Sequence, residues 1–135
     1  SVEMTKAYLI EEFTAALQAR DRASNDRYGS VIRDAKEYIR ANFSQSDLSL
    51  NRIAVHIGVS PSYFSSIFKN YTGETFIEAL TRKRVEKAKF LLENTSRKNY
   101  EIACDVGYSD PHYFSNIFKK ATGMTPTEYA RKVRK

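Results

Sequence analysis

Two stretches of the chain, fifty residues apart, carry nearly the same sequence. Residues 60–73 read SPSYFSSIFKNYTG and residues 110–123 read DPHYFSNIFKKATG, so nine of the fourteen positions are identical. In each stretch a capping residue precedes a proline, an apolar stripe follows at helical spacing, and a glycine ends the pattern. A chain of 135 residues that contains one short helix twice is predicted to build two similar helical units.

The similarity continues on both sides of these two helices. Each is preceded by a short apolar helix pattern and a glycine: Ile53, Ala54, Ile57 and Gly58 in the first copy, Ile102, Ala103, Val106 and Gly107 in the second. Each is followed by the T-x-x-E spacing of a capping box, which starts another helix at Thr75 and at Thr125. Each copy therefore predicts a helix, a tight glycine turn and a second helix, which is the helix-turn-helix pattern.

Helical periodicity predicts an all-α fold in which a long linker helix joins the two units. We expect the first unit at about 49–73, the linker helix at 75–94, the second unit at 99–123 and a terminal helix at 125–134. Ser24 or Asn25 is expected to cap a helix that ends near 41–43, within a domain of residues 25–135. Residues 1–24 are expected to form a separate N-terminal linker or signalling helix, with an apolar stripe of Leu9, Ile10, Phe13 and Leu17.

The linker helix has about twenty residues without glycine or proline, and such a helix spans about 30 Å. One face is expected to be buried, and it carries Ile77, Leu80, Ala88 and Leu91. Arg84 falls on or beside this face, which is an unusual place for a guanidinium group.

The charge of the chain is uneven. The net charge is +6, with −1 on residues 1–28 and +7 on residues 29–135, so the basic part contains the repeat. A basic surface attracts nucleic acid, an anionic membrane or an acidic protein. The absence of an apolar run near 20 residues excludes a membrane helix, and one cysteine excludes an intrachain disulfide. A cytoplasmic protein is expected, and because the first residue is Ser1 we expect a piece of a longer chain.

The exposed face of each repeated helix is polar. The predicted exposed positions are Ser62, Tyr63, Ser65, Ser66 and Lys69 in the first copy and His112, Tyr113, Ser115, Asn116 and Lys119 in the second. Neither helix carries an acidic residue after its cap, which suits a surface that faces phosphates. A second helix of this kind reads the DNA major groove, and groove faces recur about every 34 Å along the duplex. The alternative of a stacked helical repeat is disfavoured, because such repeats need three or more copies.

The two copies and their linker resemble a known family. The segment GYSDPHYFSNIFKKATGMTPTEY, together with IAVHIGVSPSYFSSIFKNYTGETFIEALTRKRVEKAKFLLENT, is similar to the AraC/XylS-type DNA-binding domain, from about Ser30 to Arg134. The resemblance implies seven helices, two helix-turn-helix units and bacterial transcription regulation. Within the family, the sequence most resembles the output domains of response regulators.

Carried over by position, the resemblance implies base-contacting residues in both units. Base-contacting positions fall on Ser62, Ser65, Ser66, His112, Tyr113 and Asn116. Beside these positions, we expect phosphate contacts from Lys69, Lys119 and Lys120, and Arg82 or Lys83 could also reach phosphate from the linker helix. Arg84 matches the linker arginine of the family, either in a structural salt bridge or at DNA. Because serine reaches base edges poorly and asparagine pairs well with adenine, we expect looser base reading by the first unit.

Other functions have weaker support in the sequence. Two histidines and one cysteine do not supply the three or four ligands of a metal site, so no metal or cofactor is expected. Cys104 is expected in or near the core, and no catalytic motif suggests an enzyme. A helical protein-interaction module with only non-specific DNA affinity remains the alternative. RNA polymerase is an expected partner, and a dimer through the N-terminal helix or a missing N-terminal domain remains open beside packing of that helix on its own domain.

Overall fold

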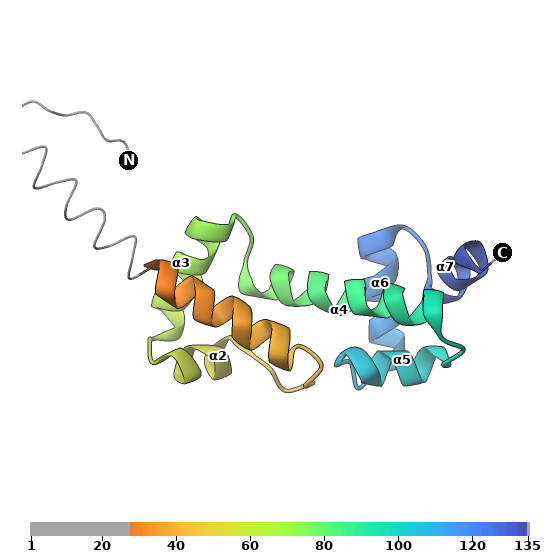
Figure 1. The fold of residues 1–135 in the computed structure, drawn as a ribbon, viewed down its shortest axis with the longest axis horizontal. Helices are drawn as coiled ribbons and strands as arrows, with labels where there is room; N and C mark the ends of the chain where they lie inside the picture. The colour runs from red at the N-terminus through yellow and green to blue at the C-terminus, as the bar shows by residue number, and fades with distance from the viewer. Residues whose placement is uncertain (1–27, 135) are drawn as a thin grey trace, which may run out of the picture.

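The computed structural model describes residues 28–134, which form seven helices and no strand (Figure 1). A helix of residues 28–42 comes first. It is followed by α2 (Leu50–Ile57), α3 (Pro61–Thr72), α4 (Phe76–Asn94), α5 (Asn99–Val106), α6 (Pro111–Thr122) and α7 (Pro126–Val133). The all-helical prediction is confirmed. The predicted helix of residues 1–24 and the caps Ser24 and Asn25 lie outside the described residues.

Local signals begin and end these helices as the repeat predicts. Ser60 caps α3 by accepting a hydrogen bond from the Tyr63 amide, and Asp110 caps α6 by accepting one from the His112 amide. Capping boxes at Thr75 and Thr125 open α4 and α7. Both α3 and α6 end at a glycine with positive φ, a conformation that other residues adopt only with strain. The duplicated sequence therefore gives duplicated helix ends.

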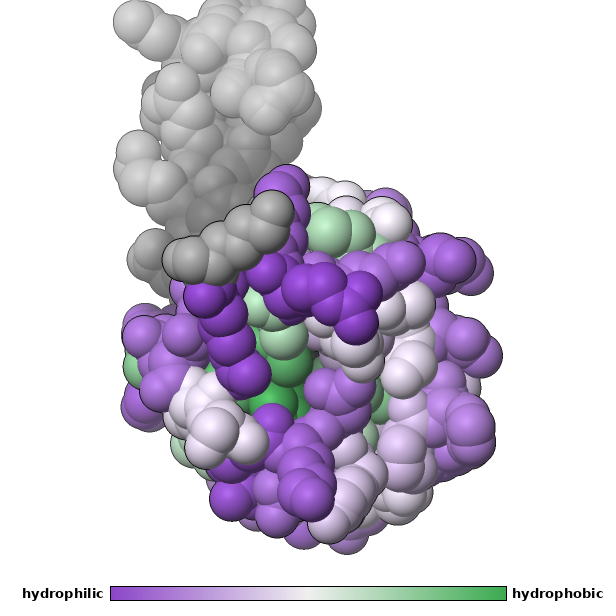
Figure 2. All heavy atoms as spheres, turned by 90° about the vertical axis from the view of Figure 1, so that its right-hand side faces the viewer, coloured by the Kyte–Doolittle hydropathy of each residue, from purple (hydrophilic) through white to green (hydrophobic). Residues whose placement is uncertain are grey.

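The molecule has two hydrophobic cores, and α4 contributes to both. Its first half supplies Phe76, Ala79 and Leu80 to a core shared with the helix of residues 28–42, α2 and α3. Its second half supplies Val85, Ala88 and Leu92 to a core shared with α5 and α6. In Figure 1, α4 runs between the two helical groups as a continuous helix. Seen from the end that carries α7, mostly polar side chains surround a small hydrophobic hollow (Figure 2).

Three positions correct the predicted burial. Ile77 is 59% exposed, because the buried face of α4 follows steps of four residues from Phe76, one position away. Leu91, on the same predicted face, is only partly buried, and Leu92 takes the core position. Cys104 is exposed, because Ile102, Ala103 and Val106 occupy the buried face of α5.

Candidate nucleic-acid interface

The exposed faces of α3 and α6 carry the predicted base-contacting side chains. In α3, Phe64, Ile67 and Phe68 are buried, whereas Ser62, Ser65 and Ser66 are exposed. In α6, Phe114 and Phe118 are buried, whereas His112, Tyr113 and Asn116 are exposed. Tyr63 and Ser115, two other positions expected on these faces, are half-buried. The six base-contact assignments stay predictions, but the fold leaves all six side chains accessible.

The charge on these two helices lies at one end. Neither α3 nor α6 has an acidic residue in its first turn. The last turn of α3 carries Lys69, and the last turn of α6 carries Lys119 and Lys120. All three lysines are exposed, and the Lys69 ammonium donates to the Gly73 carbonyl at 3.2 Å. A polyanion that lies along either helix would therefore meet the ammonium groups of these lysines at the end of the helix.

The tyrosine at the start of α6 is supported from behind. The Tyr113 ring lies edge-on to Tyr108, with 5.7 Å between the ring centroids, yet Tyr113 remains 54% exposed. Tyr108 is buried and also packs on Phe114, at 5.8 Å. In the first unit the equivalent Tyr63 meets Tyr28, at 6.4 Å. Both units therefore hold this side chain in place with a second aromatic ring.

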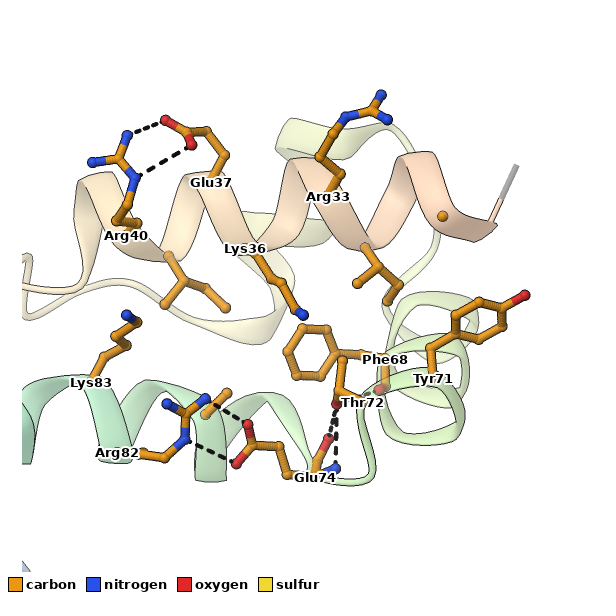
Figure 3. A pocket seen from close by; sticks show the side chains of 14 residues that line it. Arg33, Lys36, Glu37, Arg40, Phe68, Tyr71, Thr72, Glu74, Arg82 and Lys83 are labelled. Atoms are coloured by element: carbon orange, nitrogen blue, oxygen red, sulfur yellow. Dashed lines mark hydrogen bonds and ion pairs between the residues drawn. The ribbon is translucent and has the colours of Figure 1, made fainter. Parts of the chain in front are cut away.

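Arg82 and Lys83 line a groove beside α3. The groove has a volume of about 810 Å³ and lies between the helix of residues 28–42, the end of α3 and the start of α4 (Figure 3). The Arg82 guanidinium donates to Glu74 at 2.7 Å, which raises its pKa, and also contacts Glu86 at 3.4 Å. Figure 3 shows Lys36, from the helix of residues 28–42, and Lys83, from α4, pointing into the gap between these two helices. Phosphate contact by Arg82 or Lys83 stays a prediction, and Arg82 would have to share its charge with two carboxylates.

Arg84 is buried between the two units and holds two main-chain carbonyls. It is 7% exposed. Its Nε atom donates to the Phe43 carbonyl at 2.7 Å, and an Nη atom donates to the Gln45 carbonyl at 2.9 Å. The guanidinium lies over the Tyr108 ring, 4.9 Å from its centroid. Of the two roles considered for Arg84, these contacts support the structural one, and its partners are carbonyls and an aromatic ring in place of a carboxylate.

The comparisons with known proteins agree on one family. The helix-turn-helix domain family matches residues 53–132 of this chain. The HTH-type transcriptional activator Btr of Bacillus subtilis is 40% identical over 130 residues, which cover 96% of this chain and 23% of that protein. This chain belongs to the AraC-type helix-turn-helix DNA-binding domains. Within the AraC-type fold, each unit pairs a supporting helix, α2 or α5, with an exposed second helix, α3 or α6.

Solved structures support the same assignment. The C-terminal domain of AraT, a response regulator from Geobacillus stearothermophilus, is 47% identical with a TM-score of 0.75, covering 76% of this chain and 84% of that domain. The DNA-binding domain of AdpA, solved in complex with a target DNA, has a TM-score of 0.72 and covers 76% of this chain and 92% of that one. At 21% identity, that likeness concerns the fold alone.

The chain spans less than half the length of the curated relatives named below by their coverage. The chain spans 23%, 35% and 44% of the length of three of them. Within residues 28–134, no helix is both long and apolar enough to cross a membrane. The same residues contain no cluster of three or more His, Cys, Asp or Glu side chains with the arrangement of a metal site.

Sequence reasoning missed one residue of this architecture. Arg134, at the end of the predicted terminal helix, donates from Nε to the Leu92 carbonyl at 2.7 Å and from an Nη atom to the Thr95 carbonyl. Arg84 and Arg134 are fifty residues apart, as are α3 and α6. That spacing was available in the sequence, and it identifies Arg134 as the counterpart of Arg84 in the second unit.

Proposed function

We propose that this chain is the DNA-reading part of a bacterial transcription regulator, and that α3 and α6 enter adjacent segments of one major groove. One observation carries the proposal: two like helices with exposed polar faces are joined by a single continuous helix of 19 residues. Such a helix is about 28 Å long, close to the roughly 34 Å between successive groove faces on one side of B-DNA. One chain would then do what many helix-turn-helix proteins do as dimers.

Each group of residues has a proposed role in this complex. Asn116, with an amide that donates and accepts, would read an adenine edge, and His112 and Tyr113 would contact neighbouring bases. The shorter Ser62, Ser65 and Ser66 would give looser reading by α3. The three lysines of the helix ends, Lys69, Lys119 and Lys120, would bind phosphates and set the register of each helix on the duplex.

The rest of the regulator remains a matter of proposal. Btr is an activator and AraT is a response regulator by name. We propose that this domain is likewise the output part of a cytoplasmic, non-enzymatic protein in which another domain receives the signal. RNA polymerase and a second copy of the protein are the proposed protein partners. The alternative, an interaction module with only non-specific DNA affinity, is disfavoured because the α3 and α6 faces lack acidic residues and end in lysines.

Footprinting tests the two-segment proposal directly. Duplexes that bind the domain of residues 1–135 are selected from random DNA, and the protected bases are mapped. We expect two protected segments about one helical turn apart. Inserting five base pairs between them rotates the two groove faces apart by half a turn, and affinity should fall steeply. Full affinity after this insertion would exclude simultaneous binding by α3 and α6.

A further inference from the structure

The repeat contains a second pair of equivalent residues besides the reading helices. Arg84 extends from α4 to the carbonyls of Phe43 and Gln45, just beyond the helix of residues 28–42. Arg134 extends from the end of α7 to the carbonyls of Leu92 and Thr95, at the end of α4. In each unit, an arginine after the helix-turn-helix thus binds carbonyls at the end of the helix before it. A cation suits such a position, where carbonyls lack helical partners.

The surroundings of the two arginines differ. Arg134 is exposed, whereas Arg84 is covered by the turn between α5 and α6 of the second unit. At that turn, a Cβ atom on Gly107 would lie 2.8 Å from Arg84 Nε and 2.8 Å from the Phe43 carbonyl oxygen. An equivalent Cβ on Gly58, in the first unit, would meet no atom within 4 Å. The second unit therefore packs directly on the first at Arg84.

Arg84 also lies where the two cores separate. The last α4 side chain of the first core is Leu80, and the first of the second core is Val85. Long helices bend where packing does not hold them, and the four residues 81–84 between these side chains belong to neither core. Arg84 bridges this gap. Its hydrogen bonds reach the first unit, and its guanidinium lies over the Tyr108 ring. Tyr108 in turn contacts Tyr113 and Phe114 in α6.

We propose that the contact of Arg84 with Phe43, Gln45, Gly107 and Tyr108, here called the Arg84 joint, fixes the orientation of α6 relative to α3. The joint would thereby determine which spacing between two DNA segments the domain accepts. This inference rests on the proposed two-segment binding. In this proposal Arg84 is a positioning residue, because its side chain is 7% exposed and is covered by protein groups. It selects a DNA geometry, while the exposed side chains of α3 and α6 select bases.

The experiment compares Arg84→Met with its repeat counterpart Arg134→Met in residues 1–135. Both substitutions remove a guanidinium that binds two carbonyls, but only the first removes an interaction between the two units. Affinity is measured on selected duplexes in which the distance between the two segments is changed one base pair at a time. For Arg84→Met, the ratio of affinity between the best and worst spacing should fall by at least about tenfold, the effect of about 1.4 kcal/mol. Arg134→Met should retain the wild-type ratio.

A second variant keeps the test valid if Arg84→Met does not fold. Tyr108→Leu removes the ring from Arg84 and leaves its hydrogen bonds to the first unit, and it should also broaden the accepted spacings. Binding to a duplex with only the α6 segment, a measure of the second unit alone, should stay within about twofold of wild type for Arg84→Met. A wild type without two protected segments would overturn the proposed function. The inference alone would be overturned if wild-type affinity depends steeply on the spacing between the two segments and the affinities of Arg84→Met and Tyr108→Leu depend on it just as steeply.

Discussion

The two helix-turn-helix units share the residues that cap, fill and end their helices, but they differ in their exposed faces and in the contacts of their turns. Caps, buried aromatic rings and glycine stops recur at matching positions of α3 and α6. The exposed faces match less well: Ser62 and Ser66 of α3 correspond to His112 and Asn116 of α6, whereas Tyr63 and Ser65 recur as Tyr113 and Ser115. The turns differ too, since no atom lies within 4 Å of the Cβ position of Gly58, whereas Gly107 is packed against Arg84. The buried scaffold is alike in both copies, while the surfaces proposed to contact DNA and the turns facing the other copy differ.

The comparison also shows that the two units overlap. By the arginine contacts, α4 ends the first unit, because it carries Arg84, and begins the second, because its last carbonyls bind Arg134. A helix shared in this way transmits position from one unit to the other without a flexible linker. The strongest tests of the comparison therefore act on α4 and on the joint beside it, and weaker tests act on single surface residues.

Breaking α4 should have the largest effect. Lys87 is exposed in the middle of α4. In Lys87→Pro the ring removes a backbone donor and clashes with the carbonyl four residues earlier, at Lys83, where the two cores separate. The free energy of unfolding should fall by about 3 kcal/mol or more, and DNA protection should shrink towards one segment. Chemical denaturation and footprinting measure the two effects.

Lys87→Gly is the matched control for this substitution. It removes the same side chain but keeps the backbone donor, and should cost only about 1 kcal/mol. Both protected segments should remain, with a looser spacing requirement. If Lys87→Pro also protects both segments with wild-type spacing dependence, a continuous α4 is not what couples the two units.

The two glycine turns should respond differently to a methyl group. Gly58→Ala introduces strain from a φ of 90° but no close contact, and should cost about 1–2 kcal/mol. Gly107→Ala adds a clash with Phe43 main chain to a φ of 107°, and should cost roughly 2–3 kcal/mol. Thermal unfolding of both variants measures the difference. Equal costs would mean that the Gly107 turn has room to move away from the first unit.

Local signals were predictable from the sequence, and contacts between distant residues were not. The caps Ser60 and Thr75 and the glycine stops depend on residues within four positions, and the structure has them as expected. Ile77 and Cys104 were misplaced because helical periodicity alone does not decide between neighbouring positions on a helix. The role of Arg84 depends on carbonyls 39 and 41 residues away and on Tyr108, none of which a repeat pattern identifies.

Base reading should be sharper under the second unit. Asn116→Ala removes the proposed two-point contact with adenine and should cost about 1–3 kcal/mol of binding at one base pair, with loss of preference there. The equivalent change in the first unit, Ser66→Ala, should cost less, because a hydroxyl makes at most one good contact with a base edge. Binding to all single-base variants of the selected duplex measures both. Strong preference confined to the α3 segment would reverse this assignment of the two units.

The lysines at the helix ends should contribute charge without sequence preference. Replacing Lys69, Lys119 or Lys120 by alanine should weaken binding to specific and random duplexes alike. The slope of log K against log salt should become shallower by about one for each lysine that neutralises a phosphate in the wild type. Lys36→Ala serves as the control, because this exposed lysine lies on the groove beside α3 and outside both reading helices. An unchanged slope for all three variants would remove these lysines from the interface.

The smallest expected effect concerns a contact that only the second unit has. The Tyr129 hydroxyl of α7 donates to the Glu93 carboxylate of α4, and this hydrogen bond raises the pKa of Tyr129 to about 12. The equivalent residue of the first unit is the buried Ala79. Because the folded pKa lies above the unfolded value of about 10, the contact stabilises the fold fully below pH 10 and loses its effect as the pH rises through 12.

The variant Tyr129→Phe tests this contact across pH. Since both groups are partly solvated, it should lower the free energy of unfolding by less than about 1 kcal/mol at neutral pH. The difference from wild type should shrink between pH 10 and 12, as the wild-type tyrosine ionises beside a carboxylate that then repels it. Glu93→Gln keeps an acceptor without the charge, so its stability should depend less on pH over this range. If wild type and Tyr129→Phe lose stability in parallel above pH 10, the hydroxyl does not bind Glu93 in solution, and the core and the contacts of Arg84 and Arg134 hold the second unit to α4 without it.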